Sequence, residues 1–353
     1  MKYSIIVPVY NRPDEVDELL QSLTEQELKD FEVVIVEDGS QKPCKDVCDK
    51  FADILDLHYY VKENGGPGQA RNYGAERAHG EWLIILDSDV VLPKGYLKAV
   101  EDGLRGERNE ERGKFAAFGG PDASHPSFTP VQKAISYSMT SFFTTGGIRG
   151  GKKKLDKFYP RSFNMGIRSD VYQQLGGFSK MRFGEDIDFS YRIVEAGYNP
   201  QLIPDAWVWH KRRTDFRKFF RQVYNSGIAR INLEKRHPGT LKLVHLLPMV
   251  FTVGVIALIL IAAVARAMIH YDAPNWHTWY WICLLALSPI ILYSLIIFID
   301  SSIKNKSLKV GLLSVPAAFV QLMGYGFGFI ESWWKRYVMK KDEFQAFEKN
   351  FYK

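Results

Sequence analysis

Cysteine is scarce in this chain. The three cysteines, Cys44, Cys48 and Cys283, have no spacing typical of a metal site, so we expect free thiols in a reducing compartment. A secretory leader is missing too, because the apolar run in MKYSIIVPVYN is short and is interrupted by proline and asparagine. These two absences predict that the N-terminal part of the chain stays in the cytoplasm.

Two common nucleotide-binding motifs are also absent. The loop ENGGPGQARN begins like a dinucleotide fingerprint with Gly66 and Gly68, but Arg71 stands where the third glycine belongs. The phosphate-loop lysine pattern does not occur either. The glycines therefore serve either a tight turn or a helix start whose backbone N–H groups face an anion, and both interpretations stay open.

Most of the chain has no strong excess of positive or negative residues. The net charge is +6 for 353 residues, and its basic clusters lie beside apolar stretches, where anionic lipid attracts them. We therefore expect no nucleic-acid partner. Between Lys211 and Lys242, ten basic residues face only two acidic ones, which predicts a cytoplasmic segment next to a membrane.

Long apolar stretches, in contrast, are present in the C-terminal third. Each has about twenty residues without a charge, which is the length needed to cross a bilayer of about 30 Å. The segment HYDAPNWHTWYW between the first two stretches has no lysine or arginine, and the loop after the second stretch has three lysines, which predicts that only the second loop is cytoplasmic. We expect a multi-pass inner-membrane protein whose soluble part is in the cytoplasm. The stretches are Leu246–Ala265, Trp279–Ile299 and Val310–Ile330.

The third stretch is ambiguous. It contains Pro316, Gln321 and the run GYGFG at 324–328, and basic residues follow it at 335–341. Either it spans the membrane against the charge rule, or it re-enters and turns back while protein shields its irregular backbone.

The soluble part alternates strand-like and helix-like segments. We predict strands over 2–9, 32–37, 55–61 and 82–86, and helices over 14–27 and 67–79. This alternation favours a mainly parallel sheet with right-handed crossovers. Asp38 follows the second strand, and Asp87 and Asp89 follow the fourth, so these acids are expected at one edge of the sheet, where such sheets bind ligands. Alone, an Asp-Ser-Asp is either a turn or a cation site.

Two downstream segments also carry polar residues in apolar surroundings. In FGEDIDFSYRI, Glu185 and Asp186 fall in the first turn of a predicted helix, where they either cap it or act chemically. In AWVWH, His210 ends a predicted strand and three basic residues follow it. A histidine beside cations and near carboxylates favours a metal–diphosphate site over a purely structural role.

Six motifs occur in order in the first 230 residues. Together they resemble the family 2 glycosyltransferases with a GT-A fold, of the membrane-anchored bacterial type. The resemblance implies an α/β nucleotide-diphospho-sugar transferase domain, with a mainly parallel sheet flanked by helices, followed by C-terminal transmembrane helices. The motifs are PVYN (8–11), EDGS (37–40), GGPGQARNYGAERAHGEWLIILDSD (65–89), FNMGIR (163–168), GEDIDFSYRI (184–193) and VWH (208–210).

The resemblance also implies roles for matching residues. Asp87, Asp89 and His210 would hold Mn²⁺ or Mg²⁺, with Asp89 the more direct ligand, and Asp186 would be the catalytic base with Glu185 beside it. The family often has Asp-Asp-Gly-Ser where this chain has Glu-Asp-Gly-Ser, which alters the reach of the first acid. The residues implied in nucleotide or donor binding are Pro8, Tyr10, Glu37, Asp38, Arg71, Asp87, Asn164, Arg212 and Arg213.

These roles predict one reaction. A cation stabilises the departing diphosphate, Asp186 accepts the proton of an acceptor hydroxyl, and a single displacement inverts the anomeric centre. A base is unnecessary if the acceptor is a polyprenyl phosphate, and the processive-synthase motif Gln-x-x-Arg-Trp is absent after His210. We therefore favour transfer of one hexose or N-acetylhexosamine from a UDP-sugar to a lipid-linked glycan or glycolipid. The alternatives are a polyprenyl-phosphate sugar synthase and a non-catalytic membrane-tethered scaffold.

The expected organisation has four parts. Residues 1–213 form the catalytic domain, 214–242 a basic amphipathic segment, 243–331 the membrane domain and 332–353 a basic tail. The amphipathic segment lies either in the membrane surface, presenting the pocket to a lipid acceptor, or against the catalytic domain. The glycine- and lysine-rich stretch 144–157 is predicted to be a mobile loop over acceptor or diphosphate, or else a plain solvated loop.

Overall fold

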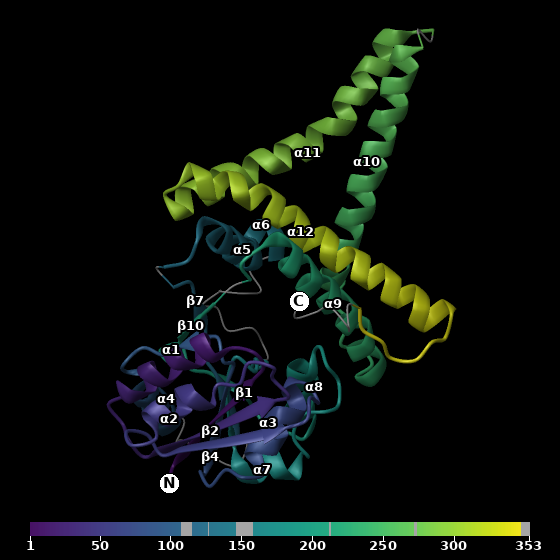
Figure 1. Cartoon of the computed structure of the whole chain (residues 1–353). Helices are drawn as coiled ribbons and strands as arrows, with labels where there is room; N and C mark the ends of the chain where they lie inside the picture. The colour runs from purple at the N-terminus through teal and green to yellow at the C-terminus, as the bar shows by residue number, and fades with distance from the viewer. Residues whose placement is uncertain (107–114, 126, 146–157, 212, 272–273, 347–353) are drawn as a thin grey trace. The chain divides into compact units, whose positions relative to one another are not determined.

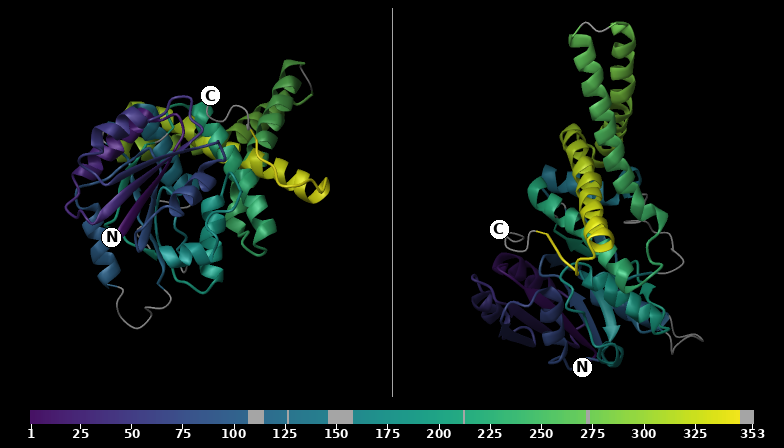
Figure 2. Two further views of the ribbon diagram at one scale, coloured as in Figure 1. Left: turned by 60° about the horizontal axis from the view of Figure 1, so that its bottom comes forward. Right: turned by 90° about the vertical axis from the view of Figure 1, so that its right-hand side faces the viewer.

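The computed structural model describes residues 1–106, 115–125, 127–145, 158–211, 213–271 and 274–346 (Figures 1 and 2). The chain divides into two compact units. The first unit consists of Met1–Pro126 and Gly150–Lys211, and the second of Ser127–Arg149 and Arg212–Lys353. Most of the predicted loop 144–157 lies outside the described residues.

The first unit is an α/β domain. Its elements in chain order are β1 (Tyr3–Val9), α1 (Pro13–Thr24), β2 (Phe31–Asp38), α2 (Lys45–Phe51), β3 (Leu57–Lys62), α3 (Pro67–Ala75), β4 (Trp82–Leu86), β5 (Val90–Val91), α4 (Tyr96–Gly106), β6 (Ala117–Gly119), β7 (Asp122–Ala123), β8 (Asn164–Arg168), α7 (Ser169–Gln174), α8 (Glu185–Glu195), β9 (Gln201–Leu202) and β10 (Val208–His210).

The main sheet is mainly parallel, as predicted. Its strand order is β3-β2-β1-β4-β8-β6-β9, and the first four strands in that order run parallel. Strand β8 is antiparallel to β4 and β6. The apolar runs of β1, β2 and β4 are buried because helices cover both faces of a parallel sheet.

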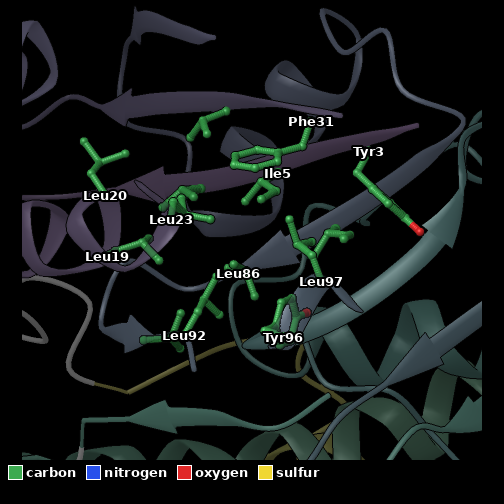
Figure 3. Close-up of a cluster of buried hydrophobic side chains, with 14 of the residues drawn as sticks. Tyr3, Ile5, Leu19, Leu20, Leu23, Phe31, Leu86, Leu92, Tyr96 and Leu97 are labelled. Carbon is green, nitrogen blue, oxygen red and sulfur yellow. The ribbon is translucent and has the colours of Figure 1, made fainter. Parts of the chain in front are cut away.

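Two hydrophobic clusters fill the two faces of this sheet. One joins strand residues to α1, α2 and α4, and Figure 3 shows Leu19, Leu20 and Leu23 of α1 packed there beside Ile5. The other joins the opposite strand faces to α3, α7 and α8, with Ile6 and Phe189 fully buried. This two-sided core fixes the carboxyl ends of β1, β2 and β4 along one edge.

A small second sheet extends that edge. Its order is β5-β10-β7, and β10 is antiparallel to β5, with His210 opposite Val90. The same strand is parallel to β7, with Val208 opposite Asp122. The pairing brings the end of β10 next to the segment that follows β4, although more than a hundred residues separate them in sequence.

The second unit is helical. Its elements are α5 (Pro130–Thr140), α6 (Phe142–Thr145), α9 (Phe216–Arg236), a short 3₁₀ helix (Leu243–Leu246), α10 (Leu247–His270), α11 (Trp276–Asn305), α12 (Leu308–Trp333) and a π-helical turn (Trp334–Val338). Among the described residues, three segments are long and apolar enough to cross a membrane: Leu243–His270, Trp276–Asn305 and Leu308–Val338.

Helix α12 is continuous through the glycine-rich run and does not turn back within it. The glycines permit close packing instead. A Cβ at Gly328 would lie 2.0 Å from the backbone oxygen of Tyr224 in α9, and one at Gly326 would lie 2.1 Å from the hydroxyl of Thr252 in α10. Small residues at such positions let helix backbones approach closely, so GYGFG here is a packing surface.

Residues 216–236 of the amphipathic segment form helix α9. Its Phe219 and Val223 are buried against Ile135 and Met139 of α5. This apolar side of α9 is therefore covered by protein.

Candidate active site and metal centre

Asp87, Asp89 and His210 meet at the edge of the sheet. One oxygen or nitrogen from each lies within 4.8 Å of the others, and His210 Nε2 is 3.2 Å from Asp89 Oδ1. The chain reaches this geometry because β4 ends at Leu86 and β5 then pairs with β10. Two carboxylates and an imidazole are a donor set that suits Mn²⁺ or Mg²⁺.

Two neighbours flank the ring of His210. Its ring stacks on Phe163 with centroids 4.9 Å apart and planes 23° apart. On the other side, its Nδ1 lies 3.8 Å from Asp122 Oδ2. At 3.8 Å this contact is electrostatic and too long for a direct hydrogen bond. The sequence offered no signal for Asp122, because only the pairing of β7 with β10 brings it here.

Arg12 supplies a cation at the same site. Its Nη1 lies 2.9 Å from Asp89 Oδ2 and 3.5 Å from Glu15 Oε1. Arg12 directly precedes the first residue of α1, and its side chain crosses to the segment after β4. It was not among the residues identified from the sequence, where it is one arginine among many beside a proline.

Arg71 connects the metal centre to helix α8. The side chain is buried in α3; its Nη2 donates to Asp87 Oδ1 and its Nη1 to Glu185 Oε1, both at 2.8 Å. Burial raises the pKa of Glu185 to about 7, in opposition to the charge of Arg71. One guanidinium therefore holds together the two acidic motifs that the sequence places about a hundred residues apart.

Asp186 sits beside Glu185 in a different environment. Its Oδ2 accepts a 2.6 Å bond from Arg161 Nε, and its Oδ1 accepts one from the backbone N–H of Ile187 at 2.9 Å. Burial by itself would raise the pKa of Asp186, but the charge and hydrogen bond of Arg161 outweigh it, with help from Arg71, and lower that pKa. The carboxylate is thus ionised at neutral pH. Arg161 is a further residue that the sequence did not single out.

The two acids that end β2 support the loop around the site. Asp38 accepts from the backbone N–H groups of Gly65 and Gly66 and from Lys62 Nζ, each at 2.8 Å. It thereby fixes the glycine-rich turn before α3, in which Gly66 has a φ of +88°. Glu37 accepts from the backbone N–H of Cys44 at 2.8 Å and from the hydroxyls of Ser40 and Tyr59.

The remaining candidate residues are more dispersed. Pro8 lies in β1, with Tyr10 directly after that strand. Asn164 is buried in β8, where it donates to the carbonyl of Ala206 and accepts from the hydroxyl of Tyr96, both at 2.7 Å. Of the two basic residues after Lys211, Arg212 lies outside the described residues and Arg213 belongs to the second unit.

Two protein-family models match the sequence over most of the chain. The model described as "Glycosyl transferase family 2" matches residues 4–110, and the one described as "Glycosyl transferase family group 2" matches residues 82–298. The second match covers more than half of the chain and includes all three residues of the candidate metal centre.

Individual proteins are similar over different lengths. Poly(ribitol-phosphate) beta-N-acetylglucosaminyltransferase TarS of Staphylococcus aureus is 39% identical over 102 residues, which is 28% of this chain but only 18% of that protein. Glycosyltransferase AglE of Haloferax volcanii is 26% identical over 240 residues, 65% of this chain and 73% of that protein. Pre-mycofactocin glycosyltransferase of Mycobacterium tuberculosis is 27% identical over 252 residues, 67% of this chain and 48% of that protein.

A solved structure shares the fold. The mannosyltransferase PcManGT from Pyrobaculum calidifontis, in complex with GDP-Man and Mn²⁺, superposes with a TM-score of 0.56 at 15% sequence identity, covering 95% of this chain and 88% of that one. This likeness concerns the fold, and it agrees with the mainly parallel sheet described above.

Proposed function

Because the chain belongs to glycosyltransferase family 2, we propose that it transfers one sugar from a nucleoside-diphosphate sugar to a hydroxyl of a membrane-associated acceptor. The observation that carries this proposal is the linkage made by Arg71. It contacts Asp87 of the metal centre and Glu185 beside Asp186, so that a diphosphate site and a base belong to one buried network.

Asp87, Asp89 and His210 would hold the metal ion. When bound, Mn²⁺ or Mg²⁺ supplies positive charge to the departing diphosphate. Arg12 is within 2.9 Å of Asp89 and is placed to bind phosphate oxygens beside the ion. Arg71 keeps Asp87 in position, so that the aspartates after β4 stay pre-oriented and need not reorganise during reaction.

Asp186 would accept the proton of the acceptor hydroxyl. The carboxylate is ionised, and the backbone N–H of Ile187 together with Arg161 fixes its orientation. A hydroxyl oxygen that loses its proton to Asp186 attacks the anomeric carbon from the face opposite the diphosphate, so the configuration inverts. An already ionised phosphate acceptor would make this base unnecessary, so the polyprenyl-phosphate alternative ranks below a hydroxyl acceptor.

The donor and acceptor follow from chemistry and from the related proteins. TarS is named as an N-acetylglucosaminyltransferase and PcManGT as a mannosyltransferase, so we propose a hexose or N-acetylhexosamine donor, with UDP as the preferred nucleotide. Three apolar helices follow the catalytic elements. They favour a lipid-linked glycan or glycolipid as the acceptor and an inner-membrane location with the catalytic domain in the cytoplasm.

A donor screen tests the proposal. The full chain is purified in detergent with Mn²⁺ and a host lipid extract, and release of UDP or GDP is measured from a panel of nucleotide sugars. We expect lipid-dependent release from one donor that stops when the metal is chelated. Absence of release together with absence of metal-dependent nucleotide binding would contradict the proposal and favour a non-catalytic scaffold.

Arg161→Ala is expected to shift the acid limb of the pH–rate profile to higher pH. In the native protein Arg161 lowers the pKa of Asp186, so the base stays ionised as the pH falls. Without that charge, Arg71 and the backbone N–H of Ile187 still lower the pKa of Asp186. Burial then raises the pKa of Asp186, and turnover falls at a higher pH than in the native protein.

Two variants control this measurement. Arg161→Lys keeps the charge and should move the acid limb much less. Arg168→Ala removes an arginine that pairs with the exposed Asp170 and should leave the profile unchanged. If Arg161→Ala lowers turnover equally at every pH, Arg161 does not set the ionisation of Asp186.

A further inference from the structure

The third apolar helix, α12, contacts at its beginning a helix that precedes all the apolar segments. Val310 and Ala317 of α12 pack in one buried cluster with Ala134 of α5. Ala318 joins a second cluster with Tyr137 of α5 and Ile297 of α11. The first third of α12 therefore lies against α5.

The end of α12 contacts α9, which also precedes the apolar segments. The hydroxyl of Tyr224 in α9 bonds to Glu331, and Ser332 Oγ donates to the carbonyl of Ile228 at 3.3 Å. Gly227 of α9 faces the backbone of α12 so closely that a Cβ there would meet Tyr325 O at 2.2 Å. Both ends of α12 are thus tied to α5 or α9, and Figure 1 shows α12 running along them.

The chain after α12 returns to α9 as well. Asn225 is fully buried; its side chain donates to the carbonyl of Ala346 at 3.1 Å and accepts from the N–H of Ala346 at 2.9 Å. About two and three turns further along α9, Asn232 donates to the carbonyl of Phe344, and Arg236 pairs with Glu343 at 2.9 Å. These contacts hold residues 343–346 along α9.

Helices α5 and α9 belong on the same side of a membrane as the first unit. Helix α5 has 11 residues and α6 has four, too few to cross a bilayer, which takes about 20. Both lie in sequence between two segments of the first unit. Helix α9 follows that unit and has basic residues throughout its length, among them Lys218 and Arg230, so it is not a span.

Helix α12 is more deeply buried inside the protein than the other two apolar helices. In its most apolar window 44% of the residues are buried inside the protein, compared with 17% in α10 and 11% in α11. Helices α10 and α11 pack on each other and on α12, and they expose large side chains such as Leu260 and Leu285, as a hairpin in lipid would. Helix α12 is covered by α5 and α9 on one side and by α10 and α11 elsewhere.

The segment at the end of α12 exposes side chains that favour a bilayer surface. Trp333, Trp334 and Tyr337 are each more than two-fifths exposed, and Lys335 and Arg336 lie among them. Tryptophan and tyrosine concentrate at the membrane–water boundary, and basic residues there are attracted to anionic lipid.

We infer that α12 does not cross the membrane but lies in the surface of the leaflet that faces the catalytic domain, with its Trp333–Tyr337 end among anionic headgroups. The chain then crosses twice, through α10 and α11, and its C-terminal segment is on the same side as α5, α9 and the first unit. This arrangement removes the conflict in the sequence, because the lysines before α12 and the basic residues behind it all remain on one side. It does not depend on the reaction proposed above.

Labelling of single cysteines in sealed membrane vesicles tests this arrangement. The background is the full chain with Cys283→Ala; Cys44 and Cys48 stay because both are buried, and this background serves as the blank. Three exposed positions then receive a cysteine: Glu76→Cys in the first unit, Thr278→Cys at the start of α11 and Asp342→Cys behind α12. A membrane-impermeant maleimide is added before and after the vesicles are opened.

The readout is which positions react together. We expect Asp342→Cys to be labelled in the same vesicles as Glu76→Cys, and Thr278→Cys to react only in vesicles of the opposite orientation or after opening. If Asp342→Cys reacts together with Thr278→Cys, then α12 crosses the membrane and the inference is overturned. Glu76→Cys reports the orientation of the vesicles directly, so the result does not rest on an assumed preparation.

Discussion

Asp186→Asn is expected to lower turnover by about 10²–10⁴-fold, the usual contribution of a positioned general base, while nucleotide binding stays unchanged. Asparagine keeps the size of the side chain, but its single carbonyl oxygen can accept from only one of the two donors, Arg161 or the N–H of Ile187, because these bond to different oxygens of Asp186. It cannot take up the proton of the acceptor hydroxyl. Steady-state rates with the donor found in the screen, together with nucleotide titrations in Mn²⁺, measure both effects.

The matched control lies in the same helix. Asp188 is buried like Asp186 and accepts from an arginine, Arg192 Nε, at 3.1 Å. Asp188→Asn should reduce stability but leave turnover within a few-fold of the native value. Native turnover in Asp186→Asn would refute the assignment of the base. If Glu185→Gln were then the inactive variant, the neighbouring carboxyl would be the base instead.

Arg71→Met is expected to destabilise the first unit by about 3–5 kcal/mol, the cost of removing one partner from a buried ion pair, and to abolish transfer. Methionine fills much of the space but leaves Asp87 and Glu185 without their counter-charge. Glu185 already has its pKa raised to about 7 by burial, and without Arg71 it is expected to be protonated in the folded protein. The apparent melting temperature in detergent and the nucleotide-release assay report the two losses.

A surface arginine provides the comparison for this variant. Arg105 pairs with Glu101 at 2.8 Å, the same distance as between Arg71 and Asp87. The side chain of Arg105 is 60% exposed, however, whereas that of Arg71 is 4% exposed. Arg105→Met should therefore cost under about 1 kcal/mol. Adding Glu185→Gln to Arg71→Met removes one of the two carboxyls that have lost their counter-charge. The double variant should therefore be more stable than Arg71→Met alone. If the two arginine variants had equal melting temperatures, Arg71 would not hold the buried network together.

The sequence predicted the sheet well because its signal is local. Apolar runs such as SIIVPV and VVIV are buried on both faces, and they pair in the parallel order that the alternating helices imply. The two predicted helices were less accurate at their ends. The helix expected over 67–79 ends at Ala75, and Gly80 then turns the chain so close to Ser4 that a Cβ would meet its backbone nitrogen at 2.6 Å.

The sequence could also place the acids but not their partners. Asp87 and Asp89 were expected at one edge because they follow a strand, and the family resemblance implied that His210 joins them; the three residues do meet. Arg12, Asp122 and Arg161 could not be found in this way. Each is a common charged residue in a loop or short strand, and what distinguishes it is a contact with a residue at least 25 positions away.

By itself, then, the sequence determined the strands, the edge where the acids gather and the existence of three apolar helices, since periodicity and length express local backbone and solvation preferences. Only the tertiary structure decided that Arg71 joins the two acidic motifs. It also decided that α12 is bound at both ends to helices that precede the membrane segments. The physical reason is that desolvated charge pairs and close helix packing depend on residues far apart in the chain, and these become neighbours only when the core is assembled.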